Sequence, residues 1–257
     1  MKWCAAAAVS AAVLAVGASA LAQSGIPNNN WRQTDRPPRD ESIASPQHFA
    51  FELRFGPYYP EVDDEFVNTP GPYERAFGSG GQFYFGLELD WQALRIPYVG
   101  AIGPGYGWGI TSRSSPAKRE GTDIESGQDT SLTIMPLHLS LVLRADELMR
   151  RTGIPLVPYG KLGVGFALWW SHSGGDTASY DGVVGKDTTW GIHSALGLML
   201  ALNWLDPHSA ASLDETTGIN HAYLFGEWMN AQLNGLGSRP QMRVGTSTWV
   251  LGLALDF

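Results

Sequence analysis

The residues best suited to chemistry in this chain are charged and imidazole side chains that alternate with large apolar ones. The pattern is clear at Glu52 and Arg54, which are interleaved with Phe51, Leu53 and Phe55. A period of two places successive side chains on opposite faces of a β-strand. The charged face predicted in this way contains Glu52, Arg54, Glu88, Asp90, His138, Arg144, Lys161, His193 and Glu227.

Three kinds of chemistry are open to such a set. Buried charges are tolerated only when they pair and form hydrogen bonds, so the favoured interpretation is an internal network of ion pairs that fills a narrow lumen. The second interpretation is a polar pore or a small-ligand site lined by the same residues. The third is a catalytic constellation.

A catalytic group of His, Ser and an acid is conceivable at His172-Ser173, with Asp176 nearby. No nucleophile elbow or fixed spacing supports it, so no catalytic residue is predicted. The acidic run from Glu61 to Glu65 lacks the alternating oxygens and the glycine of an EF-hand loop, and we expect a solvated loop there. Metal-binding motifs of His and Cys are absent from the sequence, so we predict no metal and no cofactor.

The alternating pattern recurs along the chain and predicts an all-β fold. The last stretch places Trp249, Leu251, Leu253, Leu255 and Phe257 on one face. An even number of such strands is typical of an antiparallel transmembrane β-barrel, here an eight-stranded one. The predicted strands are residues 48–56, 80–91, 98–111, 130–143, 156–171, 189–202, 220–230 and 243–257, and the register of 220–230 is open to reversal.

Glycine rows and aromatic belts favour a barrel over a soluble sandwich. Gly103, Gly105, Gly107 and Gly109 share one face of their strand, which indicates close approach of another surface inside a narrow lumen. Aromatic residues gather at the strand ends, as they do at membrane interfaces. The predicted interfacial set is Trp91, Tyr98, Trp108, Trp169, Trp170, Trp190, Trp204, Trp228 and Phe257.

The links between strands also fit a barrel that spans a membrane. Residues 59–79, 112–129, 173–188 and 231–242 are polar and are predicted as outer loops. The opposite links are residues 92–97, 145–155 and 206–218. We expect one or two helical turns that end at Gly153 in the second of these, and a capped helical turn that begins at Asp206-Pro207 in the third.

Composition and the N-terminal residues narrow the class of protein further. The 257 residues have a mean hydropathy of −0.12, and no apolar run long enough for a membrane helix follows residue 22. The net charge of −8 argues against nucleic acid as a partner. Residues 1–22 have the pattern of a secretory signal peptide, residues 23–46 that of a flexible polar leader, and residues 47–257 form the predicted barrel. Cys4 is the only cysteine, so no disulfide is expected after cleavage.

The predicted barrel resembles the small outer-membrane barrels of the OmpA/OmpX/OmpW type. The stretches FELRFGPYYPEVDDEF (51–66) and PYGKLGVG (158–165) are similar to a barrel family of myxobacteria and related Gram-negative bacteria. The resemblance covers about residues 47–257 and implies an integral protein of the cell outer membrane.

The expected function is non-enzymatic, either structural or in surface interactions through the outer loops. The alternatives are a narrow channel for ions or small hydrophobic solutes and, further off, a lipid-modifying enzyme. The partners that the resemblance implies are outer-membrane lipid, lipopolysaccharide and the barrel assembly machinery, which would recognise the strand that ends in Phe257.

Overall fold

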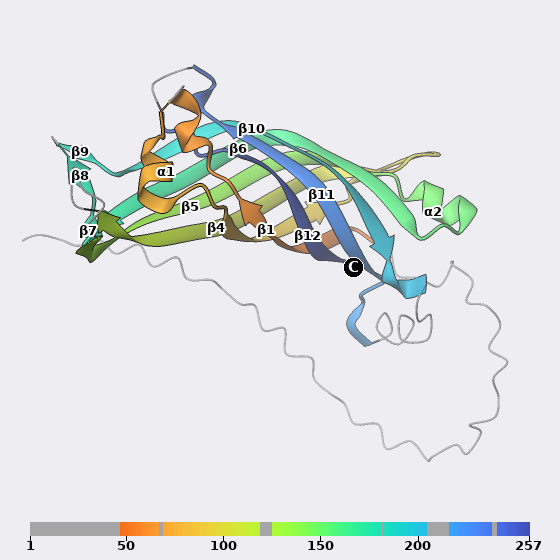
Figure 1. The fold of residues 1–257 in the computed structure, drawn as a ribbon. Helices are drawn as coiled ribbons and strands as arrows, with labels where there is room; N and C mark the ends of the chain where they lie inside the picture. Colours follow the sequence, from red (N-terminus) through yellow and green to blue (C-terminus); the bar gives the residue numbers. More distant parts are fainter. Residues whose placement is uncertain (1–46, 67–68, 119–124, 181, 205–215, 238–240) are drawn as a thin grey trace, which may run out of the picture. The chain divides into compact units, whose positions relative to one another are not determined.

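The computed structural model describes residues 47–66, 69–118, 125–180, 182–204, 216–237 and 241–257 (Figure 1). The predicted signal peptide and leader lie outside these residues. Within the described part, eight strands pair antiparallel in chain order, and β12 pairs with β1 to close the wall. These strands are β1 (Phe49–Tyr58), β2 (Gln82–Trp91), β4 (Gly100–Lys118), β5 (Glu125–Arg144), β6 (Leu156–Ser173), β10 (Lys186–Ala201), β11 (His221–Leu233) and β12 (Thr246–Asp256).

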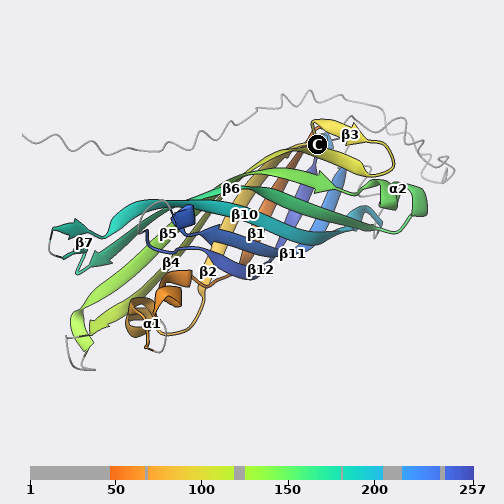
Figure 2. The same ribbon diagram turned by 90° about the horizontal axis from the view of Figure 1, so that it is seen from above.

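The strands are staggered around the barrel. A path that starts at Ala50 in β1 and follows paired residues through the wall arrives at Thr246 in β12. Ala50 itself stands opposite Asp256 of β12, so the path closes ten residues away from its starting pair. A stagger of this kind requires tilted strands, usually by about 35–45° in closed barrels. Figure 2 shows the near and far walls crossing obliquely.

Along each strand, charged and polar side chains are buried inside the barrel and large apolar side chains are exposed on its outside. Glu52 and Arg54 have no solvent exposure, whereas Leu141 and Leu196 are 55% and 75% exposed. A water-soluble barrel would bury these leucines, since an exposed apolar band of this extent is unfavourable in water. The exterior therefore matches a hydrocarbon environment, as in transmembrane barrels.

The two ends of the barrel differ. The end that we call the cap end carries η2 (Glu61–Glu65), α1 (Pro72–Phe77), β7 (Asp176–Thr177), β8 (Ser179–Tyr180), β9 (Val183–Val184) and η4 (Gly235–Gly237). The opposite end, the turn end, carries β3 (Leu94–Ile96), α2 (Glu147–Thr152) and η3 (Leu202–Trp204) (Figure 1). Among the described helices, none has the length and apolar character needed to cross a membrane.

The predicted strands are confirmed, but the predicted outer loop at residues 112–129 is too long. Residues 112–129 are not simply a loop, because β4 continues to Lys118 and β5 begins at Glu125. The link 59–79 contains η2 and α1, and the link 92–97 contains β3. The helical turn before Gly153 is confirmed, with Gly153 in the left-handed region at φ 71°. Most of 206–218 lies outside the described residues.

The open question about residues 220–230 is resolved by the pairing. Glu227 of β11 stands opposite Gly197 of β10 and Val250 of β12. Tyr223, Phe225 and Glu227 are buried, whereas Leu224 and Trp228 are exposed. The register is therefore the one that places Glu227 inside the barrel.

Candidate functional site: a charged network in the lumen

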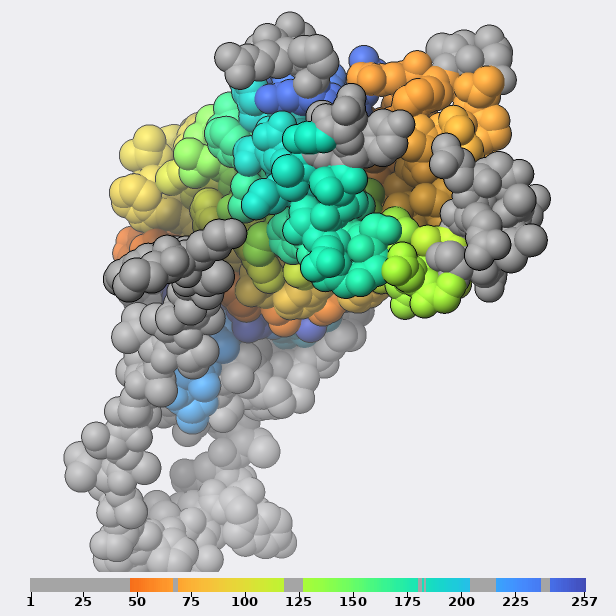
Figure 3. Space-filling model, turned by 90° about the vertical axis from the view of Figure 1, so that its left-hand side faces the viewer, coloured from red at the N-terminus to blue at the C-terminus, as the bar shows by residue number. Residues whose placement is uncertain are grey.

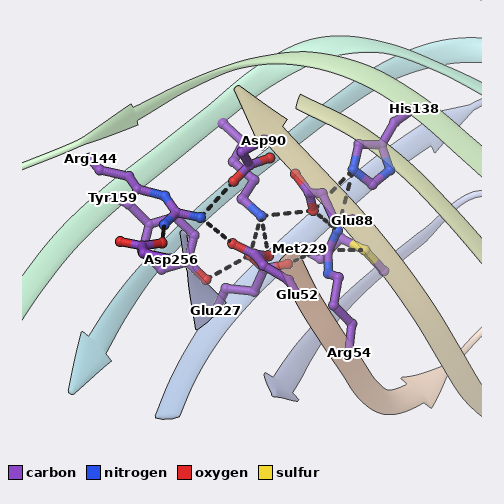
Figure 4. Close-up of polar contacts among 11 residues, drawn as sticks. Glu52, Arg54, Glu88, Asp90, His138, Arg144, Tyr159, Glu227, Met229 and Asp256 are labelled. Atoms are coloured by element: carbon purple, nitrogen blue, oxygen red, sulfur yellow. Dashed lines mark hydrogen bonds and ion pairs between the residues drawn. The ribbon is translucent and has the colours of Figure 1, made fainter. Parts of the chain in front are cut away.

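The nine charged and imidazole residues singled out by the sequence all meet inside the barrel. Arg144 is the last residue of β5, before α2, and so forms the part of this network nearest the turn end. Figure 4 shows its contacts. Its Nη1 donates to Asp256 Oδ1 at 2.9 Å, and its Nη2 donates to Glu52 Oε1 at 2.9 Å and to Asp90 Oδ2 at 2.6 Å. Four strands are thereby joined through one guanidinium.

Lys161, on β6, occupies the middle of the network. Its Nζ donates to Glu52 Oε2 at 2.7 Å and to Glu88 Oε2 at 2.8 Å, and it lies 3.7 Å from Glu227 Oε2. The Lys161 ammonium has no exposure to solvent. Since Glu52 also binds Arg144, Lys161 connects the first layer of charges to the next.

Arg54, on β1, forms the layer nearest the cap end. It donates hydrogen bonds to Glu88 and Glu227, both fully buried. His138 Nε2 lies 3.3 Å from Arg54 Nη1 and 3.3 Å from Glu88 Oε2. The His138 ring stacks on the His193 ring, with centroids 3.8 Å apart and an interplanar angle of 4°. This stack brings β10 into the network.

Two members of the network are missing from the sequence-based set of site residues. Asp256 is bound by Arg144, and the Tyr159 hydroxyl donates to Glu227 Oε2 at 2.8 Å. Both residues occupy alternating positions that face the lumen, so the alternating pattern predicts that they point inward. What the pattern lacks is the information that these side chains reach the same layer as Arg144 and Glu227.

The glycines of the wall provide room for these side chains. A Cβ on Gly107 would lie 2.1–2.8 Å from the His138 ring, and one on Gly105 would lie 2.4 Å from Asp90 Oδ1. Real Cβ atoms do not approach other atoms so closely, because packed interiors leave no space for the overlap. The glycine row of β4 is thus the surface against which the charged side chains pack, as the sequence predicts.

The charge balance of the lumen is negative. Among the described residues the network holds five carboxylates, three permanent cations and two imidazoles, joined by the contacts above. His138 Nε2 lies beside Glu88. Cross-linked carboxylates and cations of this kind can hold strands together. Glu88 Oε1, Asp90 Oδ1 and both ring nitrogens of His193 have no hydrogen-bond partner among the described residues.

On the cap-end side the lumen is aromatic and apolar. Tyr58 and Tyr84 are fully buried, with ring centroids 6.0 Å apart. Tyr73 of α1 is bound into the wall, because Gln82 Nε2 donates to its hydroxyl at 3.0 Å and Thr111 donates to Gln82 at 3.0 Å. Figure 3 views this end, where atoms of the α1 region and of the β7–β9 segment gather over the barrel.

The acidic run of the first loop has a structural role at this end. Asp63 accepts hydrogen bonds from the backbone N–H groups of Tyr73 and Glu74, at 2.8 and 2.6 Å. It therefore caps the start of α1 from outside the helix. Partial burial and the nearby Asp64 raise the pKa of Glu61, against the opposing effect of Arg243. No cluster of potential metal ligands occurs among the described residues.

The conceivable catalytic group at the cap end is not assembled. His172 pairs with Thr177, and Ser173 pairs with Asp176, along the β6–β7 turn. Over the described chain, no hydrogen bond or ion pair joins the side chains of His172, Ser173 and Asp176. The position is a strand end with solvent-accessible polar residues.

The predicted interfacial aromatics are largely on the exterior. Trp91, Tyr98 and Phe257 are exposed at the turn end, and Trp190 and Trp228 are exposed further along the wall. Trp108 and Trp170 are partly exposed. Trp169 differs, because it packs against the interior cluster and donates to Thr189 Oγ1 at 3.3 Å. The side chain of Trp204 is not among those that the structure describes.

The closed wall, apolar exterior and charged interior define a transmembrane β-barrel of the outer-membrane type. No protein-family model matches the chain, and neither does any curated protein. Among solved structures, the attachment invasion locus protein Ail of Yersinia pestis, in a complex with the heparin analogue sucrose octasulfate, is 14% identical. That match covers 83% of this chain and 100% of that chain, with a TM-score of 0.44.

Two further solved structures are similar at the same coarse level. The N-terminal β-barrel domain of Pseudomonas aeruginosa OprF is 11% identical, with a TM-score of 0.37, over 82% of this chain and 98% of that one. The outer-membrane protease OmpT of Escherichia coli is 7% identical, with a TM-score of 0.33, over 82% of this chain and 94% of that one. Because every one of these scores is below 0.5, the class rests on the barrel's own closure and exterior.

Proposed function

We propose that the protein is a non-enzymatic barrel of the outer membrane whose lumen is closed, and that it acts as a scaffold for its outer loops. The observation that carries the proposal is the network itself. Arg54, Lys161 and Arg144 each bind two or more carboxylates, and all three are buried. A conducting pore needs lining charges that face water, whereas these face one another.

The cap end is suited to present loops. The β4–β5 hairpin extends past the end of β2, with Ser112 opposite Thr133 and Ser115 opposite Thr130. The polar residues of this hairpin and the bound α1 provide a fixed surface outside the apolar band. In this proposal the cap end faces the cell exterior, and outer-membrane lipid and lipopolysaccharide surround the wall. The barrel assembly machinery would recognise β12, and kinship with the myxobacterial-type barrels is part of the same proposal.

Electrical conductance of single proteins in a planar bilayer tests the proposal against the channel alternative. We expect no steady conductance from protein that is shown to be folded by heat-shifted gel mobility. The variant Lys161→Ala would remove the central cation, and Leu162→Ala, on the lipid-facing side of the same strand, is its matched control. Steady wild-type conductance that changes in Lys161→Ala but not in Leu162→Ala would refute the closed lumen.

A further inference from the structure

An exposed patch of apolar and basic residues lies at the turn end, formed by β3, α2 and the turn between β3 and β4. We call it the β3–α2 collar (Figure 2). Leu94 and Tyr98 are 68% and 76% exposed, and Leu148 and Ile154 are nearly half exposed. A patch of this kind on a protein surface marks a site of interaction.

The apolar side of the collar continues the lipid-facing wall. Leu94 stands opposite Ile102 on β4, and Ile96 stands opposite Gly100. Residues that stand opposite each other on two antiparallel strands point to the same side of the sheet. Ile102 is at a position of β4 that faces outward. Leu94 and Ile96 therefore extend the apolar exterior beyond the end of β2, where Trp91 is exposed.

The basic side of the collar consists of three arginines that are fixed in place. Arg95 binds Asp146 at 2.9 Å, and Arg150 lies 3.4 Å from the same carboxylate. Arg151 binds Glu147 at 2.9 Å, and its guanidinium lies 4.3 Å from the centroid of the Tyr98 ring. With three cations against two carboxylates, the collar is positively charged in a chain whose net charge is −8.

The collar is held as one unit with the barrel. Glu147 N donates to Val99 O, which ties the start of α2 to the β3–β4 turn. Tyr98 has a positive φ of 68°, a conformation that costs a non-glycine residue free energy and that recurs at binding sites. The turn thereby holds an aromatic ring outward beneath Arg151. An exposed aromatic ring that is held in a costly backbone conformation indicates that the ring has a partner.

We propose that the β3–α2 collar binds anionic phospholipid of the adjacent membrane leaflet, with the headgroup phosphate on Arg150 and Arg151. Leu94, Ile96 and the Tyr98 ring contact the upper part of the acyl chains. Guanidinium groups bind phosphate oxygens in pairs, and Tyr and Arg are the side chains that occupy the membrane interface. The proposal rests on the membrane placement given under the proposed function, in which the turn end faces the periplasm.

Lipid retention tests this proposal. Protein extracted from membranes in mild detergent would be mixed with phosphatidylglycerol or phosphatidylcholine, and the bound lipid measured by native mass spectrometry. We expect the wild type to retain phosphatidylglycerol preferentially. The double variant Arg150→Gln, Arg151→Gln should lose about tenfold in that retention, since each basic residue contributes measurably to binding at an anionic surface.

The matched control is Arg75→Gln, Arg243→Gln, which removes the same charge at the cap end and should retain lipid like the wild type. Equal retention of the two lipids by the wild type, or equal phosphatidylglycerol retention by both double variants, would overturn the proposal. Retention of a copurifying protein at the collar in place of lipid would overturn it as well. Heat-shifted mobility and membrane fractionation are measured in parallel, so a protein that fails to insert would contradict the proposed function instead.

Discussion

Arg144 is the residue whose loss should most weaken the barrel. Its guanidinium binds carboxylates from β1, β2 and β12, three strands that do not pair with β5. Replacement by Met keeps much of the apolar stem and removes the charge. In Arg144→Met, Glu52 keeps its bond to Lys161, but Asp90 and Asp256 lose their cationic partner.

The expected cost follows from burial. Both aspartates are almost fully buried, so neither is well solvated once Arg144 is gone. Removal of one partner from a buried ion pair typically destabilises a protein by about 3–5 kcal/mol, because the remaining charge is uncompensated. We expect the free energy of unfolding of Arg144→Met to fall by about that amount. The exposed Arg151→Met, whose ion pair lies at the surface, should lose under about 1 kcal/mol.

Urea unfolding in lipid vesicles, followed by tryptophan fluorescence and heat-shifted gel mobility, measures this difference. Adding Asp90→Asn and Asp256→Asn to Arg144→Met removes the uncompensated charges and should recover part of the loss. If Arg144→Met unfolds like Arg151→Met, or if the added substitutions destabilise it further, the lumen carboxylates are not held by Arg144 and the reasoning is refuted.

Three further predictions concern packing, pH and the cap. Gly107→Ala should lower the free energy of unfolding by about 1–3 kcal/mol, because the added Cβ would overlap with His138. Gly127→Ala is the control and should change the free energy of unfolding little, because open space surrounds Gly127. Equal effects of the two substitutions would contradict the packing account. The raised pKa of Glu61 means that its contribution to stability is present at low pH and is lost as pH rises through the folded-state pKa. Glu61→Gln should therefore shrink the difference in melting temperature between acidic and neutral pH, and an unchanged difference would show that another group is responsible. Asp63→Ala should speed hydrogen exchange at the first turn of α1, as loss of about 0.5–2 kcal/mol of capping predicts, and unchanged exchange would exclude the capping role.

Alternation of side chains is sufficient to predict the strands and their inward faces. A shift of one residue would move every apolar side chain of a strand to the opposite face, so the pattern allows only one orientation. The sequence also placed Glu52, Lys161 and Arg144 on that face. It could not tell that Lys161 lies between Glu52 and Glu88, since that depends on the stagger of the strands around the barrel. Which inward residues share a layer is a property of the closed wall as a whole.

The cap end was harder to predict for a different reason. α1 has only six residues, and its N-terminus is capped by Asp63, which precedes the helix by several residues. Such a helix has neither the length for a 3.6-residue period nor a local capping residue. The sequence predicts loop at the extended ends of β4 and β5, because residues 112–115 and 128–131 are polar on both faces of each strand. The pairing of the two strands nevertheless continues there.

The collar shows a third limit. The sequence predicts only a short link after Trp91. β3 has no alternating pattern, because Leu94, Arg95 and Ile96 are all exposed. Short edge strands take their structure from the neighbouring strand, here β4, and so leave little trace in the sequence.

Solvent access to the lumen is the measurement that tests the closed barrel most directly. In a Cys4→Ser background, Ser140→Cys places a thiol of similar size on the buried face of β5, whereas Asp129→Cys places one at an exposed position of the same strand. A charged methanethiosulfonate reagent should modify the thiol at position 129 and leave that at position 140 unmodified over the same time in folded protein. Modification of both thiols at similar rates would mean that water and ions pass through the lumen, and would contradict the account.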